Sequence, residues 1–199
     1  MKATRRFNDA IKRIDAANRE DPRTELVEGK PQPREFLFAE RVYEWVRELV
    51  DDPSEELLLA ARAHTLRRWM IPRDRYPQTT TGYHQWREAL AHFHADEAAS
   101  ILRDAGFPDD RIRAVQAFIT KENWPGSDEA CALEDADCLV FLQTKLSHYV
   151  DTWEEGKTLR ILERTFRKMT PEGRARARRL SLGAREQALV CRAAETSNE

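Results

Sequence analysis

The sequence has few of the residues that build tight turns, disulfide bonds or membrane spans. Only seven glycines and nine prolines occur in 199 residues, which argues against an all-β architecture with many tight turns. The three cysteines, Cys131, Cys138 and Cys191, form no Cys-x-x-Cys pair, so we expect reduced thiols in a reducing compartment. The N-terminal segment holds no apolar run, and no stretch approaches the ~18 apolar residues that span a bilayer. We therefore expect a cytoplasmic protein without a signal peptide or a membrane partner.

Several familiar catalytic motifs are also missing. There is no glycine-rich phosphate loop, no Gly-x-Ser-x-Gly elbow, no His-Glu-x-x-His motif and no zinc-ribbon spacing. A net charge of −2 gives no overall attraction to nucleic acid or to an anionic membrane. Hydrophobic residues make up 41% of the chain and charged residues 34%, which is typical of a folded globular protein with a real core.

Apolar residues recur at helical spacing in nearly every segment, which predicts an all-α protein. Residues 20–33 hold three prolines and a glycine, so we expect a surface loop there. Asp52 and Thr170 each precede a proline and are predicted helix caps. We expect a helical domain over 1–150 and a C-terminal helical extension, 151–199, packed on it. The predicted helices are 7–18, 34–50, 52–69, 81–105, 109–122, 128–150, 152–168, 171–180 and 184–194.

Arginines and aromatic residues gather in 61–87, which we call the arginine segment. A guanidinium is permanently charged and presents a planar set of donors, which suits a carboxylate or a phosphate. Pro72 and Pro77 favour an extended, turning backbone between two helices. The segment predicts an anion site, although its arginines also have 35 acidic residues in the chain as potential partners.

Two histidines and an acidic group extend this predicted site. His64 precedes the first arginine pair by one helical turn, and His94 shares a helix face with Tyr83 and Arg87. Acidic residues at 134–137 open an apolar helix, where they also serve to stabilise the helix N-terminus. Candidate catalytic residues are His64, His94 and Asp137. Candidate ligand-binding residues are Arg67, Arg68, Arg73, Arg75, Tyr83, Trp86, Arg87, Lys121, Glu134 and Asp135.

Some of these residues resemble motifs of the HD superfamily of helical, metal-dependent phosphohydrolases. The run from His94 to Pro108 resembles a helix-turn-helix of that superfamily, and Ala136-Asp137-Cys-Leu resembles its last metal-ligand motif. The resemblance implies an HD-like bundle, but Thr65 follows His64 where the superfamily has aspartate. No histidine stands near Phe38, where the first metal ligand would fall, so a two-metal cluster is not expected. One divalent ion on His64, His94 and Asp137 is the alternative.

A second resemblance covers nearly the whole chain and is to domain-of-unknown-function family 4202. It rests on long motifs, including Ala-Arg-Ala-His64-x-x-Arg67-Arg68-Trp69 and Gly82-Tyr83-x-x-Trp86-Arg87. Further matching pieces are Ile-Pro72-Arg73-x-x-Tyr76-Pro77, Leu133-Glu134-Asp135 and Arg164-Thr-Phe-Arg-Lys168-Met-Thr-Pro171.

Taken together, these residues favour a protein that binds or hydrolyses a phosphorylated or carboxylated small molecule in an Arg/His-lined pocket. A binding protein and a phosphohydrolase with a degenerate metal site both fit this set of residues. The alternative function is an RNA- or tRNA-binding accessory protein that uses the arginine segment and the basic region 160–179. A purely structural interaction protein is the third interpretation.

Overall fold

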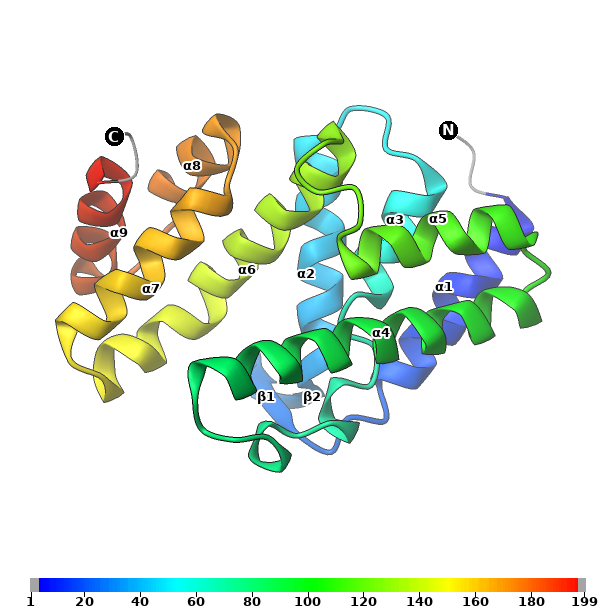
Figure 1. Cartoon of the computed structure of the whole chain (residues 1–199), viewed down its shortest axis with the longest axis horizontal. Helices are drawn as coiled ribbons and strands as arrows, with labels where there is room; N and C mark the ends of the chain where they lie inside the picture. Colours follow the sequence, from blue (N-terminus) through cyan, green and yellow to red (C-terminus); the bar gives the residue numbers. More distant parts are fainter. Residues whose placement is uncertain (1–3, 197–199) are drawn as a thin grey trace. The chain divides into compact units, whose positions relative to one another are not determined.

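The structure is a computed structural model that describes residues 4–196. Within these residues the chain forms nine α-helices, two short 3₁₀ helices and one antiparallel hairpin, which confirms the all-α class (Figure 1). None of the described helices has both the length and the apolar character needed to cross a bilayer. The elements are α1 (Arg5–Asn18), β1 (Thr24–Val27), β2 (Lys30–Pro33), α2 (Arg34–Leu49), α3 (Glu55–Ala63), η1 (Arg68–Met70), η2 (Arg73–Arg75), α4 (Thr80–Asp104), α5 (Asp109–Thr120), α6 (Asp128–Thr152), α7 (Glu155–Lys168), α8 (Pro171–Arg178) and α9 (Ala184–Thr196).

The chain divides into two compact units, one that ends at Ala130 and one that begins at Cys131. The division lies inside α6, earlier in the chain than the predicted boundary at 150.

The core of the first unit forms around α3. This helix contacts α1, α2, α4 and α5, and Leu57, Leu59 and Ala60 on it are fully buried. Burying one leucine side chain contributes about 1.5–3 kcal/mol to the stability of the fold. A helix that is apolar on most sides gains this energy only when other helices surround it. Helix α5 packs along α4, the helix that carries His94.

The predicted loop at 20–33 is wrong, because part of it forms the β1–β2 hairpin. Val27 pairs with Lys30, and the two residues between them, Glu28 and Gly29, have φ angles of 51° and 77°. Two positive φ angles match the type I′ turn that fits the twist of a hairpin. The Glu-Gly pair is a weak form of the Asn-Gly signature, so the sequence signal was missed. Leu26 on this hairpin is 75% exposed.

The start and the end of the predicted helix 52–69 are also wrong. Ser54, and not Asp52, caps α3, because its hydroxyl accepts a hydrogen bond from the backbone N–H of Leu57. The carboxylate of Glu129 accepts hydrogen bonds from the Ser54 N–H and hydroxyl, each 2.7 Å long. The α-helix then ends at Ala63, so residues 64–79 of the arginine segment form turns and the short helices η1 and η2 instead of continuing α3.

The second unit comprises α7, α8, α9 and the part of α6 that follows Ala130. Its core includes Leu162 and Phe166 on α7 and Val190 on α9, all fully buried. The predicted cap at Thr170 is confirmed, because its hydroxyl accepts from the N–H of Gly173 at the start of α8.

Candidate functional site

The arginine segment folds back onto the start of α4. Trp86 on α4 donates its indole N–H to the carbonyl of Ile71 at 2.9 Å. Gly82 lies so close to the loop that an added Cβ would be 2.2 Å from the carbonyl oxygen of Pro77. Because Gly82 has no side chain, the loop can pack against the helix at this point.

Three of the predicted ligand-binding arginines have structural partners. Arg67 pairs with Glu97 at 2.8 Å and with Glu20 at 3.1 Å. Arg73 donates to three backbone carbonyls of its own loop, and Arg75 donates to a fourth. The ion pairs of Arg67 fit the alternative in which the arginines pair with acidic residues elsewhere in the chain. Arg73 and Arg75 instead stabilise their own loop.

The other two predicted arginines are Arg68, which precedes α4, and Arg87, which follows Trp86 on α4. The guanidinium of Arg68 lies 4.8 Å from the centre of the Trp86 ring, within the range of a cation–π contact. Arg87 is half-buried and, among the described residues, forms no hydrogen bond or ion pair. Tyr83 contacts the Trp86 ring at 5.9 Å but is 46% exposed.

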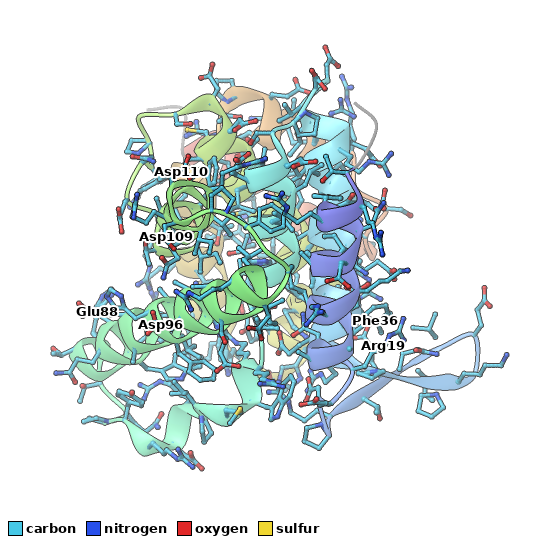
Figure 2. All side chains as sticks on the ribbon, turned by 90° about the vertical axis from the view of Figure 1, so that its right-hand side faces the viewer. Arg19, Phe36, Glu88, Asp96, Asp109 and Asp110 are labelled. Carbon is cyan, nitrogen blue, oxygen red and sulfur yellow. The ribbon has the colours of Figure 1, made fainter. Side chains whose placement is uncertain are left out.

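His94 is the most deeply buried titratable side chain of the predicted site in the first unit. It lies on α4, two turns after Arg87, and is 2% exposed. Figure 2 shows Glu88 and Asp96 on α4, and both are exposed, so the solvent-facing side of the helix is charged. His94 lies on the opposite, inward side.

The hydrogen bond of His94 determines its tautomer. Nδ1 lies 2.7 Å from the carbonyl oxygen of Leu66, which accepts hydrogen bonds only, so Nδ1 carries the proton. Nε2 is therefore left with a lone pair, and it has no hydrogen-bond partner among the described residues. Buried polar atoms are nearly always hydrogen-bonded, so this unpaired acceptor is unusual for a buried side chain.

Burial, the largest cause, and the positive charge of Arg68 lower the pKa of His94 from 6.5 to about 3. His64 and Arg87 act in the same direction, while the hydrogen bond to Leu66 opposes them. The imidazole is thus neutral at neutral pH, and two guanidinium groups are close enough to affect its titration. These residues, His64, Arg68, Arg87 and His94, are called the His94 cluster below.

His64 occupies the C-cap position of α3. Its Nδ1 lies 2.9 Å from the carbonyl oxygen of Ala61, so it too carries the proton on Nδ1, and its ring lies 5.8 Å from that of Phe38. A backbone carbonyl that accepts from one imidazole nitrogen orients the other, which is how ligating histidines are usually held.

The acidic candidates belong to the second unit and two of them have structural roles. Asp135 accepts hydrogen bonds from the Thr170 N–H, at 2.9 Å, and from the Thr170 hydroxyl. Burial raises the pKa of Asp135, and these two bonds oppose the rise. Glu134 pairs with Lys168 at 3.3 Å. Asp137 follows on the same helix, and its place in the site stays a prediction.

Lys121, the remaining candidate, is the C-cap residue of α5 and has a φ of 64°. Within residues 4–196, no three histidine, cysteine, aspartate or glutamate side chains form a group suited to a metal ion.

Sequence reasoning missed the contribution of the backbone to this site. The carbonyls of Leu66 and Ala61 select the histidine tautomers, and no side-chain pattern encodes them. It also missed a cavity lined by Arg5, Glu55 and Arg111, which contains none of the predicted residues.

A model of one protein family, described as Domain of unknown function (DUF4202), matches residues 8–190 of the chain. The chain belongs to this family. The match includes every residue of the His94 cluster, and it confirms the family assignment made from the motifs. No curated protein and no solved structure matches this DUF4202 chain, so its resemblance to the HD superfamily stays a prediction.

Proposed function

We propose that this DUF4202 protein binds a phosphorylated or carboxylated small molecule at the His94 cluster. The observation that carries the proposal is the buried Nε2 of His94, an acceptor without a hydrogen-bond partner among the described residues, beside two guanidinium groups. A ligand that fits has an anionic oxygen for Arg68 or Arg87 and a hydroxyl or N–H that donates to Nε2. A phosphate monoester and a hydroxy acid both meet this requirement.

Binding is favoured over hydrolysis by the basicity of His94. A general base works best when its pKa lies near the working pH, and the pKa of His94 is about 3. A proton acceptor this weak positions a donor group well but activates water poorly. A hydrolase of the HD-like type therefore requires a further base.

A metal ion fits the His94 cluster less well than an anion. Two imidazoles oriented through Nδ1 would suit a divalent ion, but Arg68 and Arg87 would repel it. The same two positive charges attract an anion. Nor do three histidine, cysteine, aspartate or glutamate side chains within residues 4–196 form a group suited to a metal ion, so the single-ion alternative is not proposed.

Binding of RNA is less favoured because two basic residues of the region 160–179 already have acidic partners. Lys168 pairs with Glu134, and Arg176 pairs with Glu172 at 2.7 Å. None of the three cysteines forms a disulfide bond, which supports the proposal that the protein works in a reducing cytoplasm.

Nuclear magnetic resonance of the imidazole groups tests the proposal. Inorganic phosphate that binds near Arg68 and Arg87 offsets their charge, so it should raise the pKa of His94 and shift its signals saturably. His84 is exposed on the same helix and serves as the control, with no saturable shift expected. If the His94 signals do not respond to phosphate, or if all histidines respond alike, the proposed site is wrong.

A pair of variants separates the role of Nε2 from the role of Nδ1. His94→Asn keeps a donor for the Leu66 carbonyl but removes the acceptor, so phosphate affinity should fall by about tenfold while the fold is retained. His94→Gln keeps a polar group near Nε2 and loses the Nδ1 donor, so it should cost more stability than affinity. The opposite pattern would contradict the assignment of Nε2 as the ligand-facing atom.

A further inference from the structure

The first unit contains a cavity of about 690 Å³ that includes no residue of the His94 cluster. It lies where the N-terminal ends of α1 and α3 meet the connection between α4 and α5. Cavities that hold small molecules typically measure about 300–1,000 Å³, so this one has room for a ligand the size of a mononucleotide or a dipeptide. Its wall carries the ring of Phe107 and the charged side chains of Arg5, Arg6, Asp9, Glu55 and Arg111. Asp9 is already paired with Arg13 at 2.8 Å.

Glu55 supplies an unsatisfied acceptor in this wall. It lies in the first turn of α3 and is 6% exposed. One carboxylate oxygen, Oε2, pairs with Arg111 at 3.1 Å. The other, Oε1, is buried and has no hydrogen-bond partner among the described residues. A buried carboxylate oxygen in the wall of a cavity indicates a ligand with an N–H donor.

Arg5 and Arg6 supply positive charge at another part of the same wall. They form the first turn of α1, a turn that contains no acidic residue. Neither arginine forms a hydrogen bond or an ion pair with any other described residue. The N-terminal end of a helix carries a partial positive charge, which repels the guanidinium groups of Arg5 and Arg6. A bound anion would offset this repulsion.

An aromatic ring connects the two polar regions. The guanidinium of Arg6 lies 5.6 Å from the centre of the Phe107 ring, and that of Arg111 lies 5.7 Å from it. Arg6 belongs to α1 and contacts the ring from that part of the cavity wall. Arg111 is held by an ion pair with Glu55, which belongs to α3. The wall thus offers an anion site, an apolar patch and an acceptor in one cavity.

We infer that this cavity binds a small molecule that carries both an anionic group and an N–H donor. The anionic group lies at Arg5 and Arg6, the donor reaches Glu55 Oε1, and the middle of the ligand contacts Phe107. Nucleoside monophosphates and phosphorylated amino acids share this chemistry. The site is independent of the His94 cluster.

The test compares four probes on the Arg87→Ala protein, whose His94 cluster is already weakened: AMP, GMP, O-phosphoserine and inorganic phosphate. Calorimetry should show at least one donor-bearing probe that binds about tenfold tighter than inorganic phosphate, which lacks the N–H. A preference for AMP or GMP identifies a nucleotide site, and a preference for O-phosphoserine identifies an amino-acid derivative. If none binds tighter than inorganic phosphate, the inference is wrong.

Variants then locate the site. Replacing both Arg5 and Arg6 by alanine should weaken the best probe by about tenfold or more. Glu55→Gln should weaken it too, because the amide that replaces the carboxylate is a poorer acceptor for the N–H. Lys12→Ala removes a charge from the exposed part of α1 and should leave the affinity unchanged. Because Arg5 and Arg6 are exposed, their double variant should fold, and unchanged binding in it would overturn the inference.

Discussion

Acidification should destabilise the wild-type protein more than a variant in which residue 94 cannot titrate. In the folded chain, burial and nearby arginines hold the pKa of His94 at about 3, whereas an unfolded chain has the ordinary value of 6.5. Between these two values, the unfolded state binds a proton that the folded state does not. The free energy of unfolding therefore rises with pH across this window and falls as the pH is lowered.

The size of the effect follows from the width of the window. Each pH unit below 6.5 should cost about 1.4 kcal/mol, so acidification to pH 4.5 should cost about 2.7 kcal/mol through His94 alone. The full contribution is present above pH 6.5 and is lost progressively toward pH 3. Other carboxylates and histidines also titrate, so the wild type by itself does not isolate this contribution.

The variant His94→Asn isolates the effect because asparagine keeps a donor for the Leu66 carbonyl and does not titrate. Urea denaturation at pH 7 and pH 4.5 gives the free energy of unfolding of both proteins. We expect the advantage of the wild type over the variant to shrink by about 2.7 kcal/mol at the lower pH. Parallel pH profiles, or an imidazole pKa near 6.5 in the folded protein, would refute the argument that His94 is buried and neutral.

Two glycine substitutions test the packing described above. Gly173→Ala should destabilise the second unit by about 1–3 kcal/mol, because the new Cβ would lie 2.3 Å from the carboxylate of Asp135. Gly82→Ala should cost a similar amount in the first unit, because its Cβ would lie 2.2 Å from the Pro77 carbonyl oxygen. Gly126→Ala is the matched control, since the nearest atom would be 3.5 Å away, and thermal unfolding should show little change. A destabilisation equal in all three variants would contradict the packing argument.

Most of the helices could be predicted from the sequence because their apolar residues recur on one face. The end of α3 could not be predicted in this way, because no residue in 64–69 is a helix-stopping residue by itself. Helix α3 ends at Ala63, and the chain then changes direction at Arg67, which has a left-handed φ of 53°. Its side chain is held by Glu97 and Glu20, which lie far away in the sequence. A local reading of the sequence does not include such tertiary contacts.

The candidate site was predictable only in part, for a similar reason. Spacing on one helix placed Arg87 and His94 on the same face, and in the structure both Arg68 and Arg87 are close enough to lower the pKa of His94. Composition alone did not separate Arg73, which binds carbonyl groups of its own loop, from Arg87, which forms no hydrogen bond or ion pair among the described residues. Likewise, the cavity at Glu55 depends on α1, α3 and the loop before α5, which come together only in the folded chain.

The most direct test of the anion site is the affinity of inorganic phosphate for three proteins, measured by calorimetry: the wild type, Arg87→Ala and Arg113→Ala. Arg113 is exposed on α5, so its replacement removes the same charge away from the His94 cluster. We expect Arg87→Ala to weaken phosphate binding by about tenfold to 100-fold, as the loss of one charge-assisted hydrogen bond predicts, and Arg113→Ala to bind like the wild type. Equal affinities in all three proteins, or no phosphate binding by the wild type, would contradict the account.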